Sequence, residues 1–187
     1  MLPIKNGTFD CLKRIKYNPT SRTALPTGVS SKVLAGGTQQ VTLTFSNTAV
    51  ALTDAGAAGA GGGIRIFGFQ QGNVKLDNYH VNLTTARLGT NLTTTAALVA
   101  SLGTVVAAAD ATLSSTEADI ASSTTATLTA GAGTFTKIAT APVYLDGTST
   151  AKDVYLNFAV PDAGSAGNDS VVVNGTITLI YSNTAVV

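Results

Sequence analysis

The feature that most constrains the fold of this chain is an alternation of apolar and polar residues with a period of two. Every second residue is apolar between Gln40 and Phe45, and the pattern returns between Asp153 and Val160. Because neighbouring side chains of a β-strand point to opposite faces, this spacing places one apolar face against a core. Helical periodicity is almost absent from the chain. The pattern therefore predicts a fold built of strands.

Short segments of this kind follow one another, separated by residues typical of turns, and about eight to ten strands are expected. The segments 73–76 and 81–88 are expected to be separate strands of a meander. The high threonine content agrees, since threonine is β-branched and suits a half-exposed strand without adding charge. Together these signals predict an all-β protein with an antiparallel β-sandwich or jelly-roll-like body over residues 36–187.

Three glycine-containing segments are assigned to connections or bulges. The glycine-rich run 54–63 is expected to be a flexible loop, because it has too little side-chain volume to pack. Asp146-Gly147 is expected to be a hairpin turn. Asn174-Gly175 is either a tight hairpin or a bulge within one long final strand, and the residues leave both open.

Residues 1–35 differ from the rest of the chain in charge and in proline content. They hold three of the five prolines and no sustained apolar pattern, so they are expected to form an extended N-terminal arm. Six basic residues and one acidic residue give the first 32 residues a charge of +5, whereas five basic and nine acidic residues give the remainder −4. This asymmetry favours contact of the arm with an acidic protein surface; contact with nucleic acid and a solvated tail are the alternatives.

The side chains from which catalytic and metal sites are usually built are scarce. The chain has one His, one Cys and no Trp. His80 has Asp77 nearby in the sequence but no nucleophile motif, and Cys11 has no histidine partner. A single acidic cluster lacks the aromatic neighbours of a sugar-cleaving site; it consists of Asp110, Glu117 and Asp119. We therefore expect no enzymatic activity, no cofactor and no resident metal.

Two further segments have both a functional and a structural interpretation. Residues 162–169 offer Asp162, Asn168 and Asp169 as oxygen ligands for a cation, but without EF-hand spacing a turn is the favoured interpretation. The uncharged stretch 88–109 is long enough to cross a bilayer. Because threonine, asparagine and glycine interrupt it and no anchoring residues flank both ends, buried strands or a short helix are favoured, and no membrane partner is expected.

Two stretches carry a likeness to a known family. They are residues 107–120, AAADATLSSTEADI, and residues 153–169, DVYLNFAVPDAGSAGND. Over residues 40–187 the chain resembles the head decoration, or cement, proteins of tailed bacteriophages, whereas the basic arm has no counterpart. The resemblance implies a β-sandwich bound to the outside of the capsid, as a trimer or dimer, that stabilises the shell against the pressure of the packaged DNA.

The residues themselves agree with that implication. A body with few charges to protect exposed strand edges is expected to cover those edges with neighbours. The expected partners are the major capsid protein and further copies of the chain, in a homotrimer or homodimer, and not nucleic acid. The expected location is the outer capsid surface of the virion, after synthesis in the cytoplasm of a bacterial host. An arm that orders on assembly would contact the capsid through Lys5, Phe9, Leu12, Lys13, Arg14, Ile15, Lys16, Tyr17 and Arg22.

The alternative function is a receptor- or glycan-binding module of a virion fibre or surface layer. Such a module requires a concave face that bears aromatic side chains. A more distant alternative, an enzyme acting on surface polysaccharide, requires the acidic cluster to meet His80 in a cleft. The best evidence for a glycan-binding module would be four tyrosines on one face: Tyr79, Tyr144, Tyr155 and Tyr181.

Overall fold

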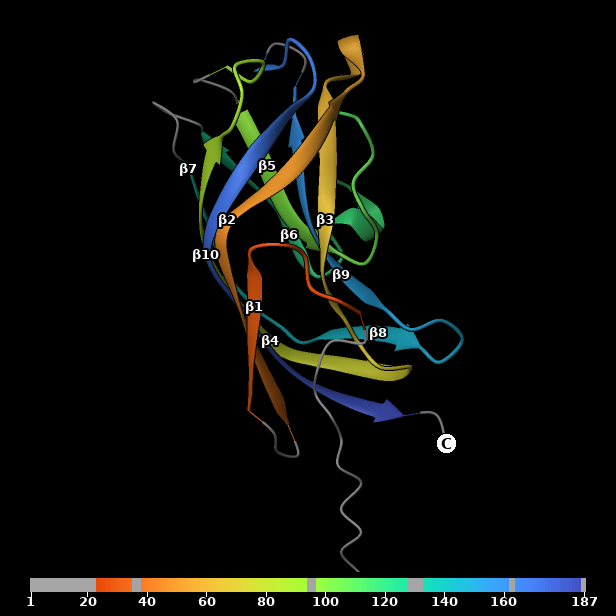
Figure 1. The fold of residues 1–187 in the computed structure, drawn as a ribbon. Helices are drawn as coiled ribbons and strands as arrows, with labels where there is room; N and C mark the ends of the chain where they lie inside the picture. Colours follow the sequence, from red (N-terminus) through yellow and green to blue (C-terminus); the bar gives the residue numbers. More distant parts are fainter. Residues whose placement is uncertain (1–22, 35–37, 94–96, 128–132, 162–163, 186–187) are drawn as a thin grey trace, which may run out of the picture.

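The computed structural model describes residues 23–34, 38–93, 97–127, 133–161 and 164–185. In these residues the chain forms strands and two single-turn 3-10 helices, η1 (Gly56–Ala58) and η2 (Ser115–Glu117) (Figure 1). The strands are β1 (Val29–Leu34), β2 (Gln39–Asp54), β3 (Ala60–Gly68), β4 (Gly72–Arg87), β5 (Ala97–Gly103), β6 (Ala121–Thr127), β7 (Gly133–Ile138), β8 (Val143–Gly147), β9 (Asp153–Val160) and β10 (Asp169–Ala185).

All strand pairs are antiparallel, in the order β6-β5-β9-β3-β2-β10-β4-β7, with β1 paired to β2 and β8 paired to β4. Strand β2 joins the two halves of the sheet. Its first part lies between β1 and β10, and its last residues, Thr53 and Asp54, pair with β3. At the ends of the path β6 and β7 come side by side, so the sheet curves almost into a closed barrel. The predicted antiparallel, jelly-roll-like body is confirmed.

The core lies between the two halves of this curved sheet. The inward residues of β2, Val41, Leu43 and Phe45, are buried, as the alternation predicts. The same holds for Val154, Leu156, Phe158 and Val160 of β9. At one end of the core the rings of Phe67, Phe69 and Tyr181 pack edge to face, with centroids 4.8–5.8 Å apart. Such pairs add to the stability that the buried apolar area provides.

One part of the expected arm is a strand of the body. Val29–Leu34 forms β1, which pairs with Gln40 to Phe45 of β2 in continuous register. The pairing places Val29 partly against the core, together with Leu25. The arm was predicted from its prolines and charges. These features do not indicate whether a short segment forms backbone hydrogen bonds with a longer neighbouring strand. Residues 1–22 lie outside the described part of the chain.

The prediction of a flexible loop over residues 54–63 is wrong for its second half. Residues 60–63 begin β3 and pair with β9. Glycine is required there by close approach of the backbone to its neighbours. A β-carbon on Gly61 would overlap the carbonyl oxygen of Ala108, and one on Gly63 would overlap Oδ1 of Asn157. The glycine run is therefore a strand beneath another segment of the chain.

The predicted hairpin turn at Asp146-Gly147 is also wrong. Both residues belong to β8, where they pair with Asn73 and Gly72 of β4, and β8 does not pair with β9. The turn comes just after them. Asp146 Oδ1 accepts hydrogen bonds from the backbone N–H of Thr148 at 3.0 Å and from its hydroxyl at 2.6 Å, which is the local bonding that aspartate favours in turns.

Two segments read as short strands are one long strand. The residues 73–76 and 81–88 belong, up to Arg87, to β4, which has 16 residues and pairs with β10 along its length. Of the two alternatives at Asn174-Gly175, the long final strand is confirmed. The register of β10 against β2 shifts between Val173 and Gly175, and Gly175 has a φ of 121°, which glycine adopts without strain.

Candidate functional site

A face on which small polar side chains predominate crosses five neighbouring strands, β1, β2, β10, β4 and β7. Two cross-strand rows follow directly from the registers. These residues form what we call the hydroxyl face: Ser30, Thr44, Thr176, Asn82 and Thr136 in one row, and Lys32, Thr42, Thr178, His80 and Ile138 in the other.

The residues between these rows point the other way, into the core. Examples are Leu43 of β2, Ile177 of β10 and Val81 of β4, each with no exposed surface. The alternation therefore creates the hydroxyl face as the outer side of the most regular part of the sheet. At its centre Thr42 and Thr178 are in hydrogen-bond contact through their hydroxyls at 3.2 Å. Lys32 is the one residue of the two rows with a permanent charge.

The other side of the molecule is covered by residues 104–120, between β5 and β6. Asn157, in the middle of β9 and fully buried, binds this segment. Its Nδ2 donates to the carbonyls of Val105 at 2.9 Å and Glu117 at 2.8 Å, and its Oδ1 accepts from the N–H of Ala107 at 3.0 Å. The segment buries Ala107 and Leu113 against β9. Sequence reasoning missed Asn157, although a polar residue within an apolar strand is a signal for such a role.

The acidic cluster of the sequence shapes this segment. Glu117 accepts from the N–H of Ala108 at 2.8 Å and of Ser114 at 3.1 Å. Asp119 accepts from the N–H of Thr104 at 2.8 Å and from its hydroxyl at 2.6 Å. Asp110 accepts from the N–H of Thr112 at 2.8 Å. The structure thus gives each of the three carboxylates a partner in the segment itself.

His80 belongs to a different part of the fold. It is exposed on β4, where it pairs with Ile138 of β7 and Thr178 of β10. The acidic residues, by contrast, follow β5 in the other half of the sheet. Nothing in the described geometry brings His80 and the acidic cluster together in a cleft. Across the described ranges no group of three or more His, Cys, Asp and Glu residues has the arrangement of a metal site.

Residues 168 and 169, which the sequence offered as cation ligands, hold neighbouring backbone segments through hydrogen bonds. Asp169 accepts from the N–H groups of Gly89 at 2.7 Å and Leu92 at 2.9 Å. Asn168 accepts from the N–H of Asp54 at 2.8 Å. Burial would raise the pKa of Asp169, but hydrogen bonds from backbone N–H groups outweigh it, so the pKa lies below its ordinary value. Asp162, the third proposed ligand, lies outside the described residues.

The four tyrosines do not form one exposed face. Tyr79 and Tyr181 are buried, and burial raises the pKa of the Tyr79 hydroxyl. Tyr155 of β9 is half-buried, and only Tyr144 of β8 is fully open, with 73% of its surface exposed. The expected aromatic face of a receptor- or glycan-binding module is therefore absent from the described tyrosines.

The candidate contact residues of the arm all fall within residues 1–22 and so lie outside the described part of the chain. They are Lys5, Phe9, Leu12, Lys13, Arg14, Ile15, Lys16, Tyr17 and Arg22. Cys11 lies there too. The chain enters the described body at Thr23, beside Gly68 at the end of β3, and then forms β1 at the edge of the hydroxyl face.

The candidate site is thus the wide hydroxyl face of an all-β body. Comparison with known protein families found no model that matches the chain, and comparison with curated proteins found no match. The resemblance to phage head decoration proteins therefore stays a prediction. No helix in the described ranges is both long and apolar enough to pass through a membrane.

Proposed function

We propose that this chain is a virion structural protein that binds the outer surface of a bacteriophage head and stabilises the shell. The observation that carries the proposal is the hydroxyl face. It spans five neighbouring strands, about 19 Å across at the usual spacing of strands, and Lys32 is its one permanently charged residue. A face of this kind suits lasting contact with protein.

The physical reason is the cost of removing water from a surface. Burying an unpaired charge is expensive, whereas hydroxyl groups find partners on many protein surfaces and cost less to bury. Five strands of one continuous sheet also hold these groups rigidly, so little side-chain entropy is lost on contact. Contacts repeated over a lattice of identical subunits add by avidity, and each need not be strong.

The arm supplies the second contact of the proposal. Residues 1–22 carry five of the basic residues of the chain and one acid, Asp10. They join the body at Thr23, beside Gly68 at the end of β3, and residues 23–28 lead from there to β1 at the edge of the hydroxyl face. In this proposal the arm contacts the same capsid surface as the face, where basic side chains pair with acidic groups and Phe9, Leu12, Ile15 and Tyr17 serve as apolar anchors. The partners are the major capsid protein and further copies of this chain, as a trimer or dimer.

The test is co-sedimentation of the purified chain with phage heads that lack a decoration protein. We expect saturable binding at a fixed number of copies per head. A chain lacking residues 1–22 keeps β1 and the whole face, and it should bind at least about tenfold more weakly, which corresponds to 1.4 kcal/mol.

The face is tested with an acidic charge placed on it. Thr44→Glu adds a carboxylate to an exposed position between Ser30 and Thr176, and it should weaken binding to heads by at least about tenfold. Ser149→Glu adds the same charge in the exposed loop after β8 and serves as the matched control. Failure of the full chain to bind any head overturns the proposal, and equal binding by the two glutamate variants removes the face from it.

A further inference from the structure

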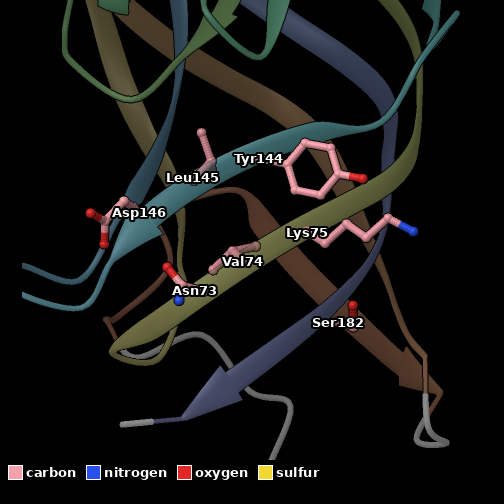
Figure 2. Close-up of a pocket in the computed structure, with 7 residues that line it drawn as sticks. All are labelled: Asn73, Val74, Lys75, Tyr144, Leu145, Asp146 and Ser182. Atoms are coloured by element: carbon pink, nitrogen blue, oxygen red, sulfur yellow. The ribbon is translucent and has the colours of Figure 1, made fainter.

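A shallow depression lies on β4, β8 and the end of β10, away from the centre of the hydroxyl face (Figure 2). Its volume is about 390 Å³. The registers pair Lys75 with Tyr144 and Asn73 with Asp146, so that two cross-strand pairs lie next to each other on the outer side of the sheet. Ser182 of β10 lies opposite Lys75 on its other side. The depression is therefore built on three neighbouring strands.

The ring of Tyr144 is the unusual element of this depression. With 73% of its surface exposed, it is the most exposed of the large hydrophobic side chains in the described ranges. By contrast, the core contains the aromatic rings of Phe67, Phe69 and Tyr181. Figure 2 shows the Tyr144 ring standing on β8 above the Lys75 side chain, with the polar groups of Asn73 and Asp146 further along the same two strands.

The charged groups around the ring are one ion pair and one carboxylate. Lys75 Nζ contacts Asp77 Oδ1 at 2.6 Å, and this hydrogen bond and ion pair raise the pKa of Lys75. Asp146 is held by the N–H and hydroxyl of Thr148 through its Oδ1, and these hydrogen bonds lower its pKa, so it is an ionised acceptor at neutral pH. An anionic ligand would face this carboxylate. The groups suit a neutral ligand with hydroxyls.

We propose that this depression binds a neutral hexopyranose unit of a surface glycan. One face of a pyranose ring carries C–H groups that pack on an aromatic ring, and its edge carries hydroxyls that need donors and acceptors. Tyr144 supplies the ring, Asp146 supplies an acceptor, and Asn73 supplies an amide with both functions. Residues two apart on a strand are about 7 Å apart, so Tyr144 and Asp146 span a single sugar ring. An exposed aromatic with a few convergent polar groups is the usual composition of such sites.

The inference does not depend on attachment to a capsid, and its test contains no capsid. The full chain is applied to an array of neutral oligosaccharides and bacterial surface polysaccharides. In parallel, methyl α-D-glucoside, methyl α-D-mannoside and methyl β-D-galactoside are titrated while the nuclear magnetic resonance signals of the protein are followed. We expect binding to at least one of these probes, with the largest shifts at Tyr144, Asn73 and Asp146.

Variants then assign the site. Tyr144→Ala should weaken binding of the bound probe at least about fivefold, whereas Tyr144→Phe keeps the ring and should retain most of the affinity. Leu88→Ala is the matched control, because Leu88 is also a large exposed apolar residue, with 64% of its surface open, and it lies outside the hydroxyl face. Both positions are exposed, so the three variants should fold, and their melting temperatures verify this. No binding to any probe, or equal weakening by Tyr144→Ala and Leu88→Ala, overturns the inference.

Discussion

Asn157 shows how much one buried polar side chain organises in this protein. Asn157 has no exposed surface, and the three hydrogen bonds of its side-chain amide go to residues 104–120. A buried amide that is fully bonded fixes the position of its partners, because any shift leaves donors and acceptors without water. Gly63 faces it across the strand pair, where a β-carbon would overlap Oδ1. The glycine and the asparagine are therefore one structural unit.

Replacing this residue should be costly. Asn157→Ala removes the amide partner of the Val105 carbonyl and the Ala107 N–H, and leaves the Glu117 carbonyl with the Ser101 hydroxyl alone. We expect it to lower the free energy of unfolding by about 2–4 kcal/mol. Asn82→Ala, at an exposed position of β4, should change it by less than about 0.5 kcal/mol. Urea denaturation of both variants checks this. A loss at position 157 no larger than that at position 82 would contradict the role of the amide.

Asp169 gives the protein a pH dependence that can be assigned to one side chain. Its folded-state pKa lies below the ordinary value of 3.8, because backbone N–H groups, Leu92 first among them, outweigh the opposing effect of burial. A carboxyl whose pKa is lowered by folding contributes stability above its unfolded pKa and loses it as the pH falls through the folded pKa. Its contribution should therefore be complete at pH 7 and disappear below about pH 4.

Asp169→Asn tests this directly. At pH 7 the variant should unfold more easily than the natural chain, by about 1–2 kcal/mol, since a charged acceptor is lost from the anchor of residues 89–92. The difference should shrink as the pH is lowered from 4 to 2. Thermal unfolding of both chains across this range measures it. A difference that stays constant from pH 7 to pH 2 would show that the carboxylate charge is not what matters.

At the scale of the strands, β6 and β7 are joined in an unusual way. They are the two ends of the sheet, and no backbone ladder pairs them in the described ranges. Lys137 of β7 crosses between them, where its Nζ donates to the carbonyl of Ser122 at 2.8 Å, the hydroxyl of Ser122 at 2.7 Å and the hydroxyl of Thr124 at 3.1 Å. One ammonium group thus links the two ends of the sheet where their edges meet.

Removing that ammonium group should loosen these strands before any others. Lys137→Met keeps most of the side-chain stem and deletes all three hydrogen bonds. We expect faster hydrogen exchange in β6 and β7, with β2 and β10 unchanged, and a loss of about 1 kcal/mol in the free energy of unfolding. Lys32→Met, on the exposed surface of β1, is the control. Uniform exchange changes across the sheet, or none, would contradict the closing role of Lys137.

The strands predicted best from sequence are those in which alternation and burial coincide. Val41 to Phe45 and Val154 to Val160 are examples, because each apolar residue there meets the core. Predictions were wrong where contact with a residue distant in the sequence determines the local structure. Residues 61–63 are glycines, with no side chain to signal a strand, and the close contacts of Gly61 and Gly63 are with Ala108 and Asn157, far along the chain. Asp146-Gly147 has the composition of a turn, but pairing with β4 keeps it extended.

For the candidate site, the sequence predicted the type of side chain but not the arrangement of these side chains on the sheet. The abundance of threonine indicated half-exposed strands without charge. The hydroxyl face, however, depends on the registers of five strands, and the register of a short polar segment such as β1 cannot be predicted from its residues. The same limit applies to the tyrosines. Period two places Tyr155 and Tyr181 within strands, but which side of a strand faces the core depends on partners that a single sequence does not specify.

For the whole molecule, the proposal joins a rigid body to a charged arm. The body is linked across the seam of β6 and β7 by Lys137, covered on one side by residues 104–120 and open on the other as the hydroxyl face. The carboxylates of Asp110, Glu117 and Asp119 hold the backbone of residues 104–120. These properties suit a protein that acts by holding neighbouring capsid subunits together.

The most direct test of that claim is the temperature at which DNA-filled heads lacking a decoration protein release their DNA. Release is followed with a fluorescent DNA-binding dye, without the chain and with the chain at saturation. We predict a higher release temperature with the full chain and a smaller increase with the chain lacking residues 1–22. An unchanged release temperature under saturating conditions would contradict the proposed stabilisation of the shell.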